Sequence, residues 1–230
     1  MQLSTDTLQV LKNFAQINGN LTIEPGNTLR TISVMRDTFA TAKVAEEFTV
    51  PFYLYDLGNF LATISLCEDP ELDFTPDYVR ITDKADNTVQ MTYWSSNPDS
   101  VCKIPTLKAL PEALAEFTLT AASIRRISKA AGVLMVSDVV ISGKDGKITA
   151  VVCDVSGANK NQMAVNLSND YNGQDFSVRI DNKKLIMITG DYHCKIIGEQ
   201  MLQAINTEKP VEYLFALAVM PKYSGLIFAL

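Results

Sequence analysis

The stretch that decides the fold lies at residues 3–18 and reads LSTDTLQVLKNFAQIN. Its apolar residues Leu8, Leu11 and Ala15 recur at helical spacing, so it predicts an amphipathic helix with one buried face. About 115 residues further on, residues 119–134 read LTAASIRRISKAAGVL and repeat that spacing. Self-similarity at such a period predicts an architecture built from two copies of one unit.

The residues that follow each helix repeat as well. A turn at Gly26-Asn27 in the first half and one at Asp145-Gly146 in the second each separate two strand-like stretches. Further along each half, an alternating strand leads into Asp56 or Asp181 and then a short helical segment. The sequence therefore predicts two similar domains, residues 1–108 and 109–230. Few helices and many antiparallel strands place it in the α+β class.

Other expected elements follow from alternation and turn residues. A proline-containing connector is expected over 95–112, and a fourth helix from Asp181. The strands are expected at 21–25, 28–35, 38–45, 48–55, 77–82, 87–94, 139–141, 148–152, 161–168, 174–180, 189–198, 211–219 and 224–229.

Composition limits the classes of protein that the chain can represent. It has 230 residues, of which 47% are hydrophobic and 20% charged, which is typical of globular domains. The net charge of −6 gives no global attraction to nucleic acid, so any such contact must come from a local basic surface. We expect neither a signal peptide nor a membrane span, and reduced cysteines at positions 67, 102, 153 and 194.

Enzyme chemistry has little support in the sequence, although it is not excluded. The chain has one histidine, His193, and on a strand its neighbour Cys194 would face the opposite way. Glycine-rich phosphate-binding motifs do not occur. The acidic residues concentrate in turns, where they are more typical of solvated side chains than of a metal cluster. No catalytic residue, metal or cofactor is expected.

A local basic excess is the clearest chemical signal. Arg125, Arg126 and Lys129 lie opposite the apolar stripe of the helix at 120–131, and no acidic residue occurs between 117 and 137. Such a face can also be an ordinary solvated helix surface. Without interleaved aromatic residues, it favours nonspecific attraction to phosphates over base stacking or base reading. The expected DNA-binding residues are Lys12, Arg125, Arg126, Lys129, Lys183 and Lys184.

Residues 3–18 closely resemble the start of the T-even-type bacteriophage sliding clamps, which are DNA polymerase processivity factors. The stretch 55–66 resembles the second helix of that family, and 94–100, 144–148 and 170–173 are similar to later segments. The resemblance covers nearly the whole chain. It ends at residues 222–230, which are more apolar than in the family.

The resemblance implies the DNA clamp fold, with two clamp domains per chain, antiparallel sheets outside and helices lining a ring. It also implies a homotrimer around double-stranded DNA in the host bacterial cytoplasm, with no enzymatic activity. The implied partners are a clamp loader, the C-terminal peptide of the DNA polymerase and phage late-transcription factors. A monomeric nucleic-acid-binding replication accessory protein and an enzyme with an unrecognised site remain alternatives.

Two further surfaces are expected from this resemblance. Sheet edges leave strands unpaired, so subunits should join edge to edge, although ordinary core alternation explains the same residues. The interface candidates are Val89, Met91, Tyr93, Trp94, Met163, Val165 and Leu167. Apolar residues after the connector and at the chain end suit a groove for a partner peptide, although the last ones could simply complete a strand. The pocket candidates are Leu107, Leu110, Leu114, Met220, Tyr223, Leu226 and Phe228.

Overall fold

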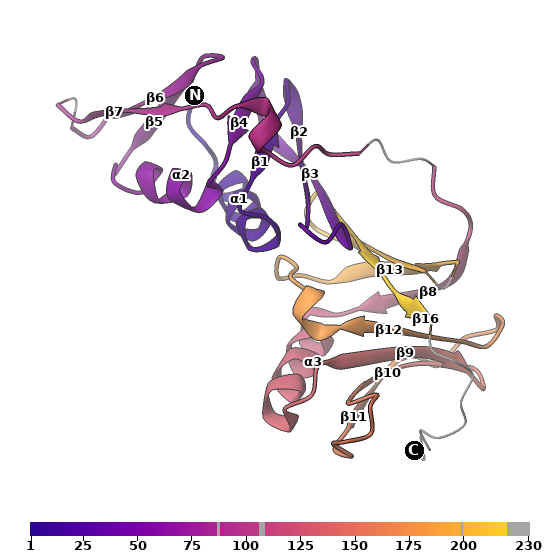
Figure 1. The fold of residues 1–230 in the computed structure, drawn as a ribbon. Helices are drawn as coiled ribbons and strands as arrows, with labels where there is room; N and C mark the ends of the chain where they lie inside the picture. Colours follow the sequence, from indigo (N-terminus) through magenta and orange to yellow (C-terminus); the bar gives the residue numbers. More distant parts are fainter. Residues whose placement is uncertain (87, 106–108, 199, 220–230) are drawn as a thin grey trace. The chain divides into compact units, whose positions relative to one another are not determined.

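The structure is a computed structural model that describes residues 1–86, 88–105, 109–198 and 200–219 (Figure 1). The chain divides into two compact units, which are described separately. Unit 1 comprises Met1–Leu107, Ile186–Ile188 and Pro210–Glu212, and unit 2 comprises Lys108–Leu185, Thr189–Lys209 and Tyr213–Leu230. Two short segments from late in the sequence therefore belong to the first unit.

Those segments are held by hydrogen bonds within unit 1. The side-chain amide of Asn13 donates to the carbonyl of Ile186 at 3.4 Å. The backbone N–H of Lys43 donates to the carbonyl of Pro210 at 2.9 Å. Both bonds join elements far apart in sequence, so the boundary of the unit is set by tertiary contacts rather than by position in the chain.

The described residues of unit 1 contain two α-helices, α1 (Thr5–Ile17) and α2 (Leu57–Ile64). Ser4 caps α1, because its hydroxyl accepts from the N–H of Thr7 at 3.2 Å. Asp56 caps α2 in the same way, accepting from the N–H of Asn59 at 2.8 Å. The two helices pack together, and α1 also packs on strands β2 and β3.

The strands of unit 1 form antiparallel pairs around an aromatic core. In that core the ring of Phe74 meets those of Phe48 and Phe52 edge-on, at centroid distances of 5.5 and 5.3 Å. β1 pairs with β4, β2 with β3, and a three-stranded sheet has the order β5-β6-β7. The elements are β1 (Leu21–Ile23), β2 (Gly26–Ile32), β3 (Thr38–Phe48), β4 (Phe52–Leu54), β5 (Pro70–Phe74), β6 (Tyr78–Asp83), β7 (Gln90–Trp94) and the 3-10 turn η1 (Pro98–Ser100).

In the part of unit 2 that the structure describes there are one α-helix, α3 (Ala121–Leu134), and two sheets. One sheet has the order β11-β10-β9-β12-β16, and in the other β15, β14, β13 and β8 lie side by side. The first two residues of β15 belong to unit 1. The elements are β8 (Ala113–Leu119), β9 (Asp138–Lys144), β10 (Lys147–Cys153), β11 (Met163–Ser168), β12 (Phe176–Asp181), the 3-10 turn η2 (Asn182–Lys184), β13 (Tyr192–Ile197), β14 (Met201–Asn206), β15 (Val211–Ala216) and β16 (Ala218–Val219).

The core of unit 2 lies partly on β13 and β15. Tyr192 and Tyr213 are fully buried with ring centroids 6.0 Å apart, and burial raises the pKa of Tyr192 to about 12. Cys194 is also fully buried, whereas His193 is half-exposed, so the expected opposite orientation of these neighbours is confirmed. The cysteines are free, as expected, although Cys102 is only half-buried.

The structure corrects several predicted elements. The fourth helix is a single 3-10 turn, η2, because the chain after Lys184 leaves the helical conformation at Leu185. Strands β5, β8 and β14 were not predicted. The first residue of β5 is Pro70, a position where a strand tolerates proline. The strand expected at 224–229 lies outside the described residues.

Candidate nucleic-acid interface and docking surfaces

The start of α3 is fixed by two hydrogen bonds. The hydroxyl of Thr120 accepts from the N–H of Ser123 at 3.1 Å. The carboxylate of Asp191, which precedes β13, accepts from the N–H of Ala121 at 2.7 Å. Both groups satisfy N–H donors that have no partner inside the helix. The helix therefore begins at a defined position, which sets the direction in which its side chains point.

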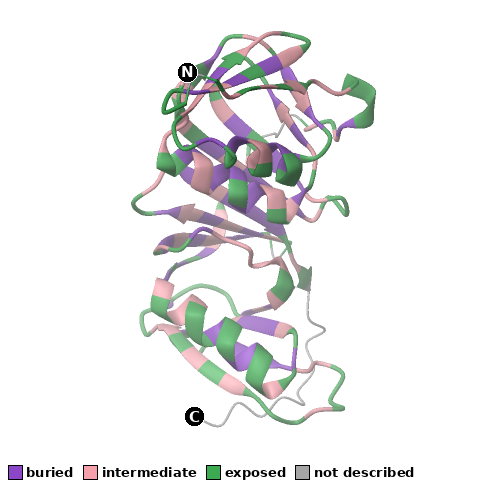
Figure 2. Cartoon of the chain, turned by 90° about the vertical axis from the view of Figure 1, so that its left-hand side faces the viewer, coloured by how far each residue is buried: buried purple, intermediate pink, exposed green. Residues whose placement is uncertain are grey.

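One face of α3 is buried and the other is basic. Ile127 and Ala131 are 2% and 5% exposed, and the helix packs on β10 and β11. Arg125, Arg126 and Lys129 are exposed on the opposite side. In Figure 2, exposed positions along the helices alternate with buried and half-buried ones. No carboxylate of the described residues forms an ion pair with these three cations. The charge of this face is thus available to an anionic partner.

The other helical segments contribute less charge. Lys12 is exposed on α1, but Asp6 occupies the first turn of the same helix. The exposed residues of α2 carry no charge. In η2, Lys183 is exposed and Lys184 is half-buried. The basic excess expected on three helices is therefore concentrated in unit 2, on α3 and η2.

The interface candidates lie on two edge strands, except for Val89, which immediately precedes β7 (Gln90–Trp94). β7 ends the sheet β5-β6-β7, and β11 ends the sheet β11-β10-β9-β12-β16, within the described part of the chain. Half-buried and exposed residues alternate along β7 and along the first part of β11, and Trp94 is 66% exposed. Each strand therefore has backbone groups along one edge that no described strand pairs.

The faces of β7 differ in what they contact. Tyr93 packs edge-on against Phe60 at a centroid distance of 5.2 Å, and its hydroxyl donates to the carbonyl of Asp56 at 3.1 Å. Trp94 instead meets the ring of Tyr78 at 5.5 Å. The candidate Tyr93 therefore supports the core of unit 1, and Trp94 is the most accessible aromatic side chain of this edge.

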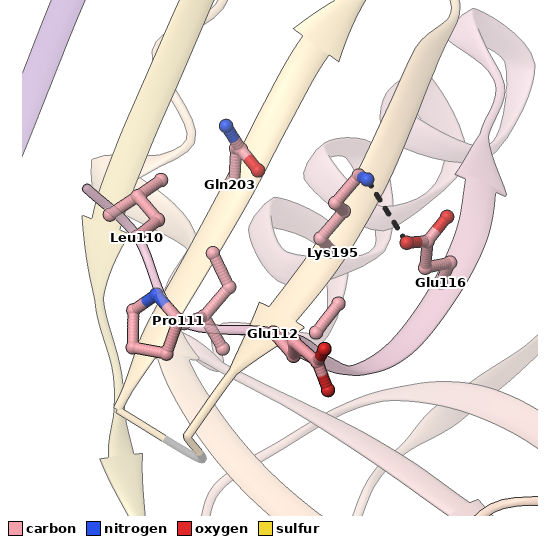
Figure 3. A pocket seen from close by; sticks show the side chains of 8 residues that line it. Leu110, Pro111, Glu112, Glu116, Lys195 and Gln203 are labelled. Carbon is pink, nitrogen blue, oxygen red and sulfur yellow. Dashed lines mark ion pairs between the residues drawn. The ribbon is translucent and has the colours of Figure 1, made fainter.

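A pocket of about 500 Å³ opens in unit 2 at the start of β8. Its apolar part comes from Leu110, Pro111, Ala113 and Ile197, as the close-up in Figure 3 shows for the labelled residues. Among the peptide-pocket candidates, Leu110 lines this cavity, and Leu114 is half-buried but does not line it. The candidates Leu107, Met220, Tyr223, Leu226 and Phe228 lie outside the described residues.

The polar wall of the pocket holds a charged cluster. Glu116 on β8 lies 3.0 Å from the Nζ of Lys195 and 3.0 Å from the Nε2 of His193, both on β13. The hydrogen bond from Lys195, together with the nearby charge of Lys195 and His193, holds the pKa of Glu116 below its usual range. His193 is thus a partner of a carboxylate on the neighbouring strand of the sheet.

Sequence reasoning did not single out two pairs of exposed apolar side chains. Val34 and Met35, between β2 and β3, are 81% and 82% exposed. Val133 and Met135, at the end of α3, are 72% and 86% exposed. Short apolar runs beside a turn, Val34-Met35 and Val133-Leu134-Met135, were the available signal, but alternation alone does not distinguish their residues from core residues.

The described residues contain no group of three or more histidine, cysteine or acidic side chains able to hold a metal ion. None of the described helices has the length and apolar character needed to cross a bilayer.

The fold is similar to those of two solved structures. The chain superimposes with a TM-score of 0.70 on the PCNA of A. fulgidus, solved with the C-terminal region of FEN-1, at 10% identity and covering 94% of this chain and 96% of that one. It superimposes with a TM-score of 0.68 on the Helicobacter pylori beta clamp bound to a DNA ligase peptide, at 12% identity and covering 95% of this chain and 65% of that one. The architecture is therefore the DNA clamp fold, as expected.

Sequence relatives identify the family. The sliding clamp of Vibrio phage KVP40 is 31% identical over 201 residues, which cover 85% of this chain and 90% of that protein. The sliding clamp of Enterobacteria phage T4 is 28% identical over 203 residues, which cover 84% and 85% of the two chains. No protein-family model matches the chain. The chain belongs to the sliding clamp family of T4-like bacteriophages.

Proposed function

We propose that this sliding clamp closes into a homotrimeric ring around double-stranded DNA and tethers the replicative DNA polymerase for processive synthesis. The observation that carries the proposal is the face of α3, where three exposed cations have no acidic partner among the described residues. Contacts to phosphates carry no sequence information, so the protein can move along the duplex without a preferred register. In this role the clamp catalyses nothing and needs no metal or cofactor.

The DNA contacts are assigned to six cations. Arg125, Arg126 and Lys129 contribute most, because they share one exposed face of α3. Lys183 and Lys184 on η2 belong to the same unit, and Lys12 on α1 is the contribution of unit 1. A ring of three copies would therefore carry its positive charge mainly on its second domains, 109–230, and less on its first domains, 1–108.

The ring would close by pairing β7 of one copy with β11 of the next. Both are edge strands with half-buried apolar side chains, and pairing satisfies backbone groups that are otherwise left to water. The residues assigned to this contact are Val89, Met91, Tyr93, Trp94, Met163, Val165 and Leu167. Trp94 supplies a large exposed side chain of the kind that dominates interface energies.

The partners follow from the tethering role. The pocket beside Leu110 offers a short peptide anchor an apolar part, from Leu110, Pro111, Ala113 and Ile197, next to a polar wall. We assign it, with the other pocket candidates, to the C-terminal peptide of the DNA polymerase. A clamp loader and the phage late-transcription factors complete the set of partners, and the site of action is the host bacterial cytoplasm.

Light scattering across a dilution series, combined with retention on DNA, tests the proposal. We expect a mass of three chains, and loaded clamp that stays on closed circular DNA but runs off the same DNA after linearisation. A monomeric mass at every concentration, with equal retention on both DNAs, would contradict the ring and favour a nucleic-acid-binding accessory protein.

A further inference from the structure

The loop between β10 and β11 shares an unusual composition with α3. The loop and the whole of β11 contain no acidic residue from Val155 to Asn169, in a chain whose net charge is −6. The loop itself contains Lys160, which is exposed, among serine, asparagine and glutamine residues. Neutral hydrogen-bond donors around a cation are typical of segments that contact a phosphate backbone.

The acidic residue that opens the loop is used inside it. The carboxylate of Asp154 accepts hydrogen bonds from the hydroxyl of Ser156 at 2.6 Å and from the N–H groups of Ser156 and Asn159 at 2.9 Å each. These bonds hold the pKa of Asp154 below its usual range, and the bond from the Ser156 hydroxyl has the largest effect. The negative charge thus orders the loop.

Asn159 fastens this ordered loop to α3. Its side-chain amide donates to the carbonyl of Leu134, the last residue of the helix, at 2.8 Å. Its side-chain oxygen accepts from the N–H of Asn161 at 3.0 Å. The two bonds hold the backbone on both sides of Lys160 against the end of a helix that is itself free of acidic residues.

We propose that this loop is an additional contact to the DNA phosphate backbone, in which Lys160 supplies the charge and Asn159 is the positioning residue. The inference rests on the proposed function, since it places a further cation, from the β10–β11 loop, beside the end of α3, the helix that carries the proposed DNA-binding face. The competing explanation is purely structural: a cation near a helix C-terminus stabilises the helix dipole.

Salt dependence separates these two roles. Each phosphate contact contributes roughly 0.9 to the slope of log affinity against log salt concentration. For a short fluorescein-labelled linear duplex, followed by anisotropy, Lys160→Gln should make the slope less steep by at least about 0.9, the contribution of one contact from one of the three copies. Lys147→Gln is the matched control: Lys147 is also exposed in unit 2, but it lies in the β9–β10 hairpin beside Asp145. It should leave the slope unchanged.

The positioning role has its own test. Asn159→Ala should weaken DNA affinity in the wild-type background and have little further effect in the Lys160→Gln background, since the two residues act through one contact. A general structural role for Asn159 would weaken binding equally in both backgrounds and would overturn the positioning claim. Urea unfolding of each variant verifies that it is folded.

The outcomes also distinguish the inference from the proposed function. If Arg125→Gln makes the slope less steep and Lys160→Gln lowers only the stability, the loop contact is refuted while the DNA-binding face of α3 stands. If neither variant alters the slope, both proposals fail.

Discussion

The carboxylate of Glu46, on β3, accepts a hydrogen bond from the hydroxyl of Thr7 in the first turn of α1. It also accepts from the backbone N–H of Ser4, the N-cap of that helix. Partial burial of Glu46 opposes ionisation, but the bonds from Thr7 and Ser4 prevail, so its pKa lies below the usual range. An acidic side chain from a strand therefore fixes the start of the helix.

Replacing Glu46 by Ala should lower the free energy of unfolding by about 1–3 kcal/mol at neutral pH, because two donors lose a charged acceptor. A carboxyl group with a depressed folded pKa contributes stability above its unfolded pKa, about 4.3 for glutamate, and loses it as the pH falls further. The difference between wild type and variant should therefore shrink below that pH. Urea unfolding across pH checks this, with Glu47→Ala, an exposed neighbour, as the control. An equal difference at all pH values would contradict the assignment.

Unit 2 repeats the arrangement with different residues. There the carboxylate of Asp191 accepts from the N–H of Ala121 at the start of α3. The repeat of apolar spacing predicted both helices, and their Ser4 and Thr120 caps lie beside them in the sequence. The two acidic anchors lie much further along the chain, Glu46 on β3 and Asp191 just before β13, and no local pattern links them to the helices. Local signals therefore predicted where the helices lie, while tertiary contacts decided how they are held.

Tertiary contacts also explain where the structure departs from the predicted elements. In the second copy of the repeated strand, aspartate and short helix, Asp181 forms the expected N-cap. Its carboxylate accepts from the N–H of Lys183 at 2.9 Å. Yet the helix is a single turn, because Ile186–Ile188 join unit 1 instead. The basic face of α3 was predictable because it needs only the helical period and the absence of acids. The phosphate contact proposed for Lys160 was not predictable from the sequence, because it depends on the hydrogen bond from Asn159 to Leu134.

Reversing the charges of Arg125 and Arg126 to Glu should weaken loading on DNA and shorten processive synthesis. Both side chains are exposed on the face of α3 away from the core, so the fold and the trimer should be unaffected. The salt slope for binding DNA should become less steep by at least about 2, one for each lost phosphate contact. The control is the double reversal of Lys144 and Lys147 in the β9–β10 hairpin. Unchanged salt-dependent function in the Arg125/Arg126 variant would remove this face from the DNA site.

Placing a charge at Val165 should shift the trimer toward monomer. The side chain is half-buried on the edge strand β11, and an aspartate there would lose water on pairing without gaining a partner. Sedimentation or light scattering across dilution measures the shift for Val165→Asp. Asn166→Asp adds the same charge to the opposite face of the strand, where the residue is exposed, and should remain trimeric. Urea unfolding separates dissociation from loss of fold. A folded Val165→Asp variant with the mass of three chains would exclude this strand from the interface.

Changing Leu110 to Asp should abolish binding of the polymerase C-terminal peptide while sparing the trimer and DNA encirclement. Leu110 forms part of the apolar lining of the pocket in unit 2, and a carboxylate there would replace an apolar contact with a hydrated charge. It would also lie in the same pocket as Glu112 and Glu116, adding to the negative charge of the lining. Isothermal titration with the synthetic peptide measures the loss. Thr118→Asp, an exposed position on β8 that does not line the pocket, is the control and should bind as wild type does. Equal peptide affinity in the Leu110→Asp variant and the wild type would place the docking site elsewhere.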